Sequence, residues 1–479
     1  MSSASNVGPT YLTRGAEEID GNPIAAHLPL APETDADAFI ALAAKPEFDF
    51  NERDLPNSIR RLRLNRLRRF FLPQLAVHRS ALSGICTSIH DGYVARNPLT
   101  AAGQRLLHGY NVDLPYSPLI TMVAGYSGMG KSTLVNRTLN YLGNQVERHI
   151  SFRGQPFPET QIVWLRRNVP EHCTVKSLVS TFGDYTDRVL GLKLYAGAFA
   201  RRTGVDRDLY LAEIRRIVST HHIGVLVLDE FQNLTLMGLG AKKIIAFLVN
   251  LRDDLGLPIV VVGTYKALRL LRSELSAARR LAEGGYYDIE RPTSPDDKGW
   301  QELCEETWQY QWVRKPMDYS ESIGDALYEV SQGITAIMVA ALTTSQAAAI
   351  ESGDECVDSA LIRKVFAERM KPLHPAIRVL QSGDPRLMDK FDDLYKNFWP
   401  GTERTEVDGI RNVEAINDIE KGALSAPLTE EQEQSSDSRP SGRSRNRADR
   451  QAPGLSVSKI RELVMAGTVT DLVALLDRP

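Results

Sequence analysis

The segment Gly125–Ser132, with the sequence GYSGMGKS, is the feature that most narrows what this chain of 479 residues can fold into. It fits the pattern G-x-x-x-x-G-K-[ST], which average composition produces by chance in a chain this long only about 1–2% of the time. The apolar run LITMVAG (119–125) leads into it, and a helix-compatible segment follows. In a strand–loop–helix arrangement the glycines let backbone N–H groups point at phosphate oxygens, at the positive end of the helix. The segment therefore predicts a nucleotide-binding P-loop.

Two side chains of this loop carry its chemistry. Lys131 can reach the β- and γ-phosphates of ATP, and the Ser132 hydroxyl can ligate Mg²⁺. ATP and Mg²⁺ are the predicted cofactors. The other candidate nucleotide-binding residues are Gly125, Tyr126, Ser127, Gly128, Met129, Gly130 and Thr133.

A second apolar run, IGVLVLDEFQN (223–233), ends in two adjacent acids. Asp229, at the carboxyl end of this predicted strand, is expected to hold Mg²⁺ directly or through water. Glu230 is expected to orient and deprotonate the attacking water. Acidic pairs at strand ends are common turn residues, so the pair predicts catalysis only in combination with the P-loop.

Two later segments supply further candidate catalytic residues. The run LPIVVVG (257–263) precedes Thr264, a candidate sensor of the γ-phosphate or the lytic water, which would also serve as a helix N-cap. Arg279 and Arg280 lie near the end of the next predicted helix, from which an arginine can reach the γ-phosphate of a neighbouring subunit. A solvated helix end also favours arginine, and the sequence does not show which of Arg279 and Arg280 would act.

Alternation of short apolar runs with helical patterns sets the fold class. The runs at 119–125, QIVWL (161–165), 223–229 and 257–263 are typical of a parallel, doubly wound α/β sheet. We therefore predict a P-loop ATPase core at 113–292, after an N-terminal basic helical extension at 55–112 and before a helical lid at 293–400. The remaining predicted parts are a loosely ordered leader (1–54), a linker that is flexible by composition (401–455) and an amphipathic, partner-binding helical tail (456–479).

Composition excludes several functional classes. The four cysteines are far apart, which argues against a zinc site or a disulfide framework. No run of about 18 apolar residues and no signal pattern occurs, so a cytoplasmic, nucleoid-associated protein without a membrane span is expected. The pair His221-His222 lacks a carboxylate at helical spacing and is expected at the surface.

A local basic segment is needed for any contact with nucleic acid, because the net charge of the chain is only −3. The segment IRRLRLNRLRRFFL (59–72) meets this condition and could contact DNA, contact an acidic partner or form a solvated helix. It holds six arginines: Arg60, Arg61, Arg63, Arg66, Arg68 and Arg69.

The order of these features resembles the TnsC/TniB group of AAA+ transposition regulators. The resemblance covers roughly residues 55–400, and TnsC fits better than TniB because of the long C-terminal extension. The nucleotide motifs are generic to AAA+ proteins, whereas Gln232-Asn233, GTYKAL and the N-terminal phrase are narrower. The stretches that carry the resemblance are RLRRFFLPQ (66–74), GYVARNP (92–98), GYSGMGKST (125–133), VLVLDEFQNL (225–234) and VVGTYKAL (261–268).

The resemblance implies an ATPase that forms rings or helical filaments on duplex target DNA and links a target-selector protein to the transposase, with the C-terminal tail contacting the transposase. Hydrolysis would promote disassembly. The lid reads GITAIM (333–338) where many AAA+ relatives carry a sensor-two arginine, which favours a slow switch over a motor. DNA contacts are expected from a loop beyond the second predicted strand, at Arg166, Arg167 and Lys176.

Two alternatives remain open on the sequence alone. One is a signalling or scaffold P-loop ATPase of the STAND type, with no role on DNA. The other is a replication-initiator-like AAA+ protein or helicase loader. The C-terminal half argues against the first, because scaffold switches usually carry winged-helix and repeat domains there.

Overall fold

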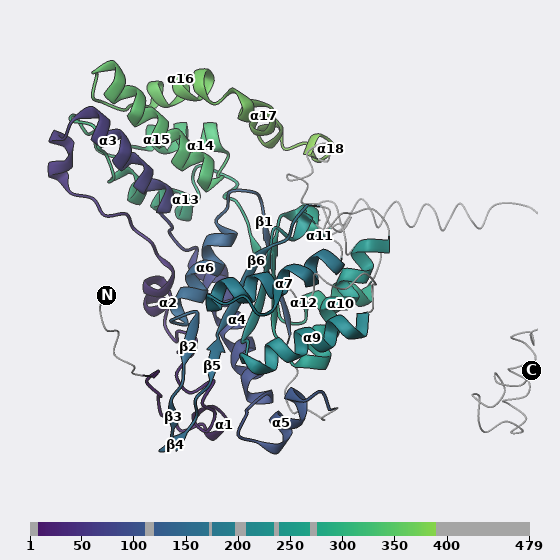
Figure 1. Ribbon diagram of the computed structural model, residues 1–479. Coiled ribbons are helices and arrows are strands. Elements are labelled where there is room, and N and C mark those ends of the chain that lie inside the picture. The colour runs from purple at the N-terminus through teal and green to yellow at the C-terminus, as the bar shows by residue number, and fades with distance from the viewer. Residues whose placement is uncertain are drawn as a thin grey trace, which may run out of the picture. The chain divides into compact units, whose positions relative to one another are not determined.

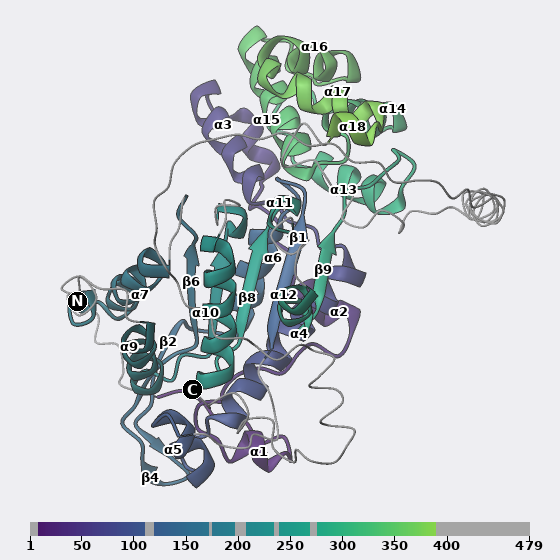
Figure 2. The same cartoon turned by 90° about the vertical axis from the view of Figure 1, so that its right-hand side faces the viewer.

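A sheet of five parallel strands lies at the centre of the structure, a computed structural model (Figures 1 and 2). Every neighbouring pair is parallel, because helical segments carry the chain back between strands. The predicted α/β class with a parallel sheet and flanking helices is confirmed. The strand order is β6 (Trp164–Asn168), β7 (Val225–Asp229), β8 (Ile259–Gly263), β1 (Ile120–Gly125) and β9 (Tyr286–Ile289).

The structure describes residues 8–110, 119–171, 175–196, 207–233, 239–268 and 275–388. All of them belong to one compact unit, residues 1–400. The predicted linker and C-terminal tail, and Cys173, lie outside the described residues.

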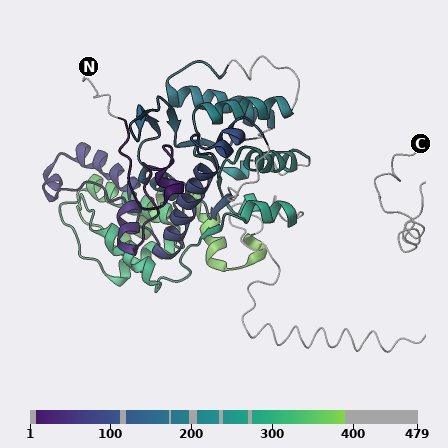
Figure 3. The ribbon, with the colours of Figure 1, turned by 90° about the horizontal axis from the view of Figure 1, so that it is seen from below.

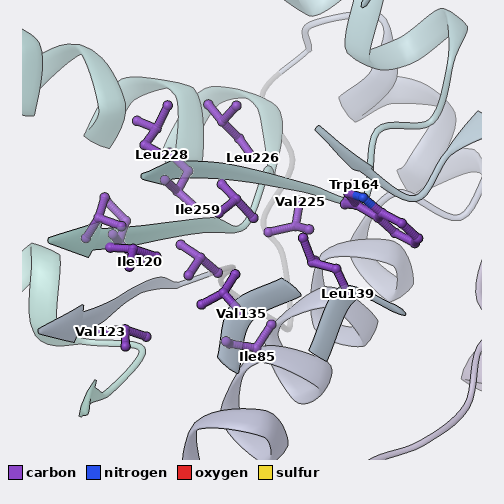
Figure 4. Packing of buried hydrophobic residues seen from close by; sticks show 14 of the residues in the cluster. Ile85, Ile120, Val123, Val135, Leu139, Trp164, Val225, Leu226, Leu228 and Ile259 are labelled. Carbon is purple, nitrogen blue, oxygen red and sulfur yellow. The ribbon is translucent and has the colours of Figure 1, made fainter. Parts of the chain in front are cut away.

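Helices cover both faces of the sheet. The helices α4 (Leu75–Ala95) and α6 (Lys131–Tyr141) lie on one face, and α7 (Val175–Leu190), α9 (Arg207–Thr220), α10 (Leu239–Leu255) and α12 (Leu275–Ala282) on the other (Figures 1 and 2). Figure 4 shows Val225 of β7 pointing toward Leu139 of α6, whereas Leu226 and Leu228 point the opposite way. This alternation buries both faces of the central strands β7, β8 and β1, which explains their continuous apolar runs.

The second predicted strand is divided in the structure. Residues Thr160–Ile162 form β5, which pairs antiparallel with β2 (Val146–Arg148), and only Trp164–Asn168 enter the main sheet as β6. The short strands β3 (Ser151–Phe152) and β4 (Gln155–Pro156) form a separate hairpin.

The N-terminal segment packs against the core, so the expectation of a loose leader is wrong for residues 8–54. Ile24, Ala25 and Leu28 are buried, and the Asn22 side-chain amide donates to the backbone oxygen of Tyr93 at 2.8 Å. The segment consists of short helices, turns and irregular backbone, so no long helical period marks its short buried apolar stretch. Its regular elements are α1 (Glu17–Asp20), α2 (Asp35–Leu42) and η1 (Phe50–Asp54).

The predicted helical lid begins at α13, and the arginine-rich segment packs on it. In all three views α3 (Asn57–Arg63) lies beside the lid helices (Figures 1, 2 and 3). Leu64 and Leu67 of η2 (Leu64–Arg69) join the lid core around Trp300 and Trp312. The lid helices are α13 (Lys298–Trp308), α14 (Glu321–Ser331), α15 (Thr335–Ser352) and α16 (Ser359–Arg369), followed by η5 (Lys371–Leu373), α17 (His374–Ser382) and α18 (Pro385–Met388).

Arg60 is structural. Its side chain is fully buried, and its guanidinium donates two hydrogen bonds to the Glu355 carboxylate, at 2.7 and 2.6 Å. Arg60 also holds the pKa of Glu355 below its usual range, mainly through these hydrogen bonds. Arg66 is similarly occupied by Glu52 at 3.0 Å. These two arginines therefore fasten the N-terminal extension to itself and to the lid instead of facing DNA, whereas Arg68 and Arg69 are exposed.

Two further sequence expectations, on membrane-spanning helices and on the pair His221-His222, can be compared with the structure. Among the described residues no single helix is long and apolar enough to cross a membrane, and α14 with α15 qualifies only as a pair bent by 116°. His221 and His222, expected at the surface, are buried, and the Nε2 atom of His221 lies 2.7 Å from the Tyr195 hydroxyl. The Phe157 ring packs against His222, with centroids 6.3 Å apart, and the Tyr195 ring packs edge-on against His221 at 5.6 Å.

Candidate nucleotide-binding site

The P-loop is shaped by a buried strand, two left-handed glycines and a helix. All six residues of β1 are buried, and α6 begins at Lys131. Gly128 and Gly130 have φ angles of 85° and 83°, which favour glycine over any residue with a Cβ. A Cβ on Gly130 would also lie only 2.8 Å from Cε2 of Phe71. The loop therefore needs glycine for its backbone and for its contact with the N-terminal extension.

Lys131 is folded over this loop. Its ammonium donates to the backbone oxygens of Gly125 at 3.0 Å and Tyr126 at 2.7 Å, and its side chain is buried. The dipoles of these two carbonyls help to stabilise the buried cation. Phosphate oxygens are stronger acceptors because they are charged, so this arrangement is suited to exchange carbonyls for phosphate.

Asp229 lies at the carboxyl end of β7, buried beside the edge strand β6. Its Oδ1 accepts from the Glu230 backbone N–H at 2.8 Å, and its Oδ2 accepts from Nη2 of Arg166 at 2.6 Å. Both oxygens are therefore engaged by donors, one of them a cation on the neighbouring strand.

The location predicted for the basic cluster is wrong. Arg166 and Arg167 lie within β6, not on a loop beyond it. Arg166 is held by Asp229, and Arg167 is 2% exposed and donates to the backbone oxygen of Leu178. The strand continues past the apolar residues because an edge strand tolerates polar side chains. Lys176 lies in the first turn of α7, and its side chain is outside the described part.

Gln232 links the predicted base to the predicted sensor. Its side-chain amide donates to Oε2 of Glu230, while its Oε1 accepts from the Thr264 backbone N–H at 3.0 Å. Thr264 is buried and lies between β8 and α11 (Tyr265–Leu268). Glu230 is exposed and has a φ angle of 56°, a conformation uncommon for a side chain with a Cβ. One amide thus fixes the distance between the ends of β7 and β8.

One cleft of about 1050 Å³ unites most of these groups. It is lined by Ser127, Gly128, Met129, Gly130, Lys131, Ser132 and Thr133 of the loop and by Asp229, Glu230 and Thr264. Gly125 and Tyr126, also predicted to bind nucleotide, do not line it. The Tyr126 ring instead packs edge-on against Tyr265, with centroids 4.9 Å apart.

Arg279 and Arg280 lie on α12, away from this cleft. Neither lines it, and the Arg279 side chain is 65% exposed, with an ion pair to Glu283 at 3.2 Å. An exposed i,i+4 pair of this kind is weak and readily exchanged. These arginines are therefore accessible to another molecule and separate from the nucleotide cleft of their own chain.

One part of the cleft wall was missed from the sequence. It comes from the N-terminal extension, with Arg68, Phe71 and His78, and from the start of lid helix α15, with Thr335 and Ala336. The backbone N–H of Ala336 donates to the Gly128 oxygen at 3.0 Å, which ties the lid to the P-loop. The stretch RLRRFFLPQ was part of the resemblance, but nothing in its pattern linked it to a loop more than fifty residues later.

Comparison with known proteins identifies the domain that holds this cleft. Residues 115–271 match the family model described as AAA domain, whereas no curated protein matches the chain. Solved structures to which the chain is similar include a Walker-type ATPase of Pyrococcus abyssi (18% identity, 62% of this chain and 84% of that chain covered, TM-score 0.37). Others are Cdc6p from Pyrobaculum aerophilum (19%, 62% and 69%, 0.41) and the Aeropyrum pernix ORC1 protein in complex with DNA (15%, 66% and 80%, 0.38). The chain thus contains an AAA-type P-loop ATPase domain over residues 115–271.

Proposed function

We propose that this chain is an ATP-dependent switch that assembles on duplex DNA in the bacterial cytoplasm and regulates transposition, linking a target-selector protein to the transposase. One observation carries the proposal: the cleft gathers the P-loop, both acids and Thr264, while Arg279 stands outside it on an exposed helix. We infer that a second copy adds an arginine to this site, beside Arg68 and Arg291, which line the cleft of the chain itself. The sequence resemblance to the TnsC/TniB group supports the DNA and transposition roles.

The chemistry proposed is hydrolysis of ATP to ADP and phosphate. Lys131 would leave the carbonyls of Gly125 and Tyr126 for the β- and γ-phosphate oxygens. Glu230 would take one proton from a water as the water oxygen bonds to the γ-phosphorus and the bond to the β–γ bridging oxygen breaks. Gln232, held by the Thr264 backbone, would keep the Glu230 carboxylate oriented toward that water.

The residues present fit Mg²⁺. The Ser132 hydroxyl and the Asp229 carboxylate line the same cleft, and oxygen ligands of this kind suit the ion. Mg²⁺, when bound, neutralises charge on the β- and γ-phosphate oxygens. Asp229 would have to exchange its hydrogen bond from Arg166 for the ion.

Subunit assembly follows from the position of α12. In an oligomer, Arg279 or Arg280 would stabilise the developing charge on the γ-phosphate of the neighbouring subunit. ATP would then favour assembly on DNA, and hydrolysis would favour release. Lys176 is the remaining candidate for contacting DNA phosphates among the three basic residues predicted to do so. Arg166 and Arg167 lie in β6 and already donate hydrogen bonds within the chain, to Asp229 and to the Leu178 oxygen.

Duplex binding tests this proposal directly. The affinity of the full chain for a fluorescent DNA duplex is measured by anisotropy with ATP, with a slowly hydrolysed analogue and without nucleotide, over a range of salt. We expect binding only with nucleotide and a steep loss of affinity with salt, and Lys131→Ala serves as the nucleotide-free control. Equal binding in all conditions, or none, contradicts the proposal. Strand separation of the duplex would instead favour the initiator or loader alternative.

A further inference from the structure

His78 lies in the first turn of α4, where it lines the nucleotide cleft. Its side chain is 2% exposed. The ring lies against Phe71, with centroids 5.4 Å apart and planes tilted by 34°. Phe71 in turn contacts the loop at Gly130. The two rings therefore form a continuous wall that begins at the phosphate-binding loop.

The backbone of the N-terminal extension fixes which nitrogen of this histidine carries the proton. The backbone N–H of Gln74 donates to Nδ1 of His78 at 2.7 Å. A backbone N–H can only donate, so Nδ1 must accept and the neutral imidazole carries its proton on Nε2. Burial also lowers the pKa of His78 to about 4, which keeps the ring neutral at pH 7. His78 therefore holds an N–H donor at Nε2.

This donor has no protein partner in the part of the chain that the structure describes. Nε2 of His78 is buried and makes no hydrogen bond. Buried N–H groups are nearly always paired, and each exception calls for an explanation. His78 lines the nucleotide cleft, so a ligand bound there can pair with this donor once the side chains that cover Nε2 move aside.

We propose that His78 recognises the base of the bound nucleotide, by donating its Nε2–H to a ring nitrogen of a purine that packs beside Phe71. The proposal rests on the proposed ATPase function and adds a base contact to it. A purine offers unprotonated ring nitrogens as acceptors as well as an aromatic face, and the wall offers the matching donor and an aromatic ring. The phosphates would remain on the loop, so base and phosphate recognition would be separable.

Two variants and two kinds of ligand test this separation. His78→Asn keeps an acceptor for the Gln74 N–H but removes the donor at the Nε2 position, whereas His78→Gln keeps a donor there. We expect His78→Asn to bind ATP about tenfold more weakly, the loss of one hydrogen bond, and His78→Gln to lose less. Affinity for inorganic tripolyphosphate, which has no base, should be unchanged in both variants.

Analogues of ATP that lack one ring nitrogen identify the acceptor. Of 1-deaza-, 3-deaza- and 7-deaza-ATP, one should bind the unaltered chain about tenfold more weakly than ATP does, and His78→Asn should not discriminate against it. Unchanged ATP affinity in His78→Asn overturns the inference alone. An equal loss for tripolyphosphate also overturns it, because the effect would then be structural. Failure of the unaltered chain to bind ATP would instead overturn the proposed function and this inference together.

Discussion

The buried pair Arg60–Glu355 allows a stability prediction to be worked out from the structure. Arg60→Met removes the charge but keeps much of the volume. The guanidinium that is lost donates five hydrogen bonds, two of them to Glu355 and the others to oxygens of Leu55, Asn57 and Trp312. The oxygens of Leu55, Asn57 and Trp312 must then find another donor or remain unpaired.

The expected loss of unfolding free energy is about 3 kcal/mol. Breaking a buried ion pair by removing one partner costs about 3–5 kcal/mol, because the other charge stays buried. The Glu355 side chain is 8% exposed. It keeps hydrogen bonds from Arg314, at 3.1 Å to the backbone N–H and 3.4 Å to the guanidinium, which offset part of the loss. The lower end of the range is therefore expected.

Arg61→Met is the matched control. Arg61 lies next to Arg60 in α3, but its pair with Glu351 is 3.7 Å long and both side chains are about half exposed, at 53% and 47%. Such a pair contributes less than about 1 kcal/mol. Urea unfolding followed by the fluorescence of the lid tryptophans measures both variants. Equal losses in the two, or a loss below about 1 kcal/mol for Arg60→Met, would refute the structural role of Arg60 and revive its role on DNA.

Four further outcomes are expected. Lys131→Ala should abolish measurable ATP binding by calorimetry, and retained binding would contradict the role given to the loop. Glu230→Gln should lower turnover by about 10²–10⁴-fold while ATP binding persists, consistent with loss of a general base; native turnover would exclude that role. Arg166→Ala should lower the Mg²⁺ concentration needed for half-maximal turnover by about tenfold, because Asp229 loses a competing charged donor; a higher requirement would show that Arg166 supports the site. Burial lowers the pKa of His27 to about 3, so its contribution to stability is present above about pH 6.5 and is lost below it, by about 1.4 kcal/mol per pH unit; urea unfolding at pH 7.5 and 5.5 should show this loss, which His27→Gln should reduce.

The sheet could be predicted where strands are buried on both faces. The runs that became β1, β7 and β8 are continuously apolar because helices cover each side of them. The edge strand β9, with the sequence YYDI, is only partly buried, so its polar residues conceal it. The division of 161–165 at Val163 could not be predicted either, because Val163 is itself apolar and buried.

The candidate site shows the same limit. The P-loop and the acid pair are contiguous sequence motifs, so they could be recognised from the sequence. Phe71 and His78 join the same cleft only in the folded structure, so their place in it could not be predicted. Arg60 and Arg166 illustrate the reverse error. A run of basic residues shows where positive charge lies in the sequence, but it does not show which carboxylates those residues pair with. In the fold Arg60 pairs with Glu355 and Arg166 pairs with Asp229, both buried.

Negative-stain imaging of the full chain with duplex DNA tests the central claim most directly. The samples contain ATP, a slowly hydrolysed ATP analogue or no nucleotide, and Glu230→Gln with ATP provides a non-hydrolysing form. We expect rings or filaments on DNA with the analogue and with Glu230→Gln in ATP, and none without nucleotide. Single particles of one chain in every condition would contradict it.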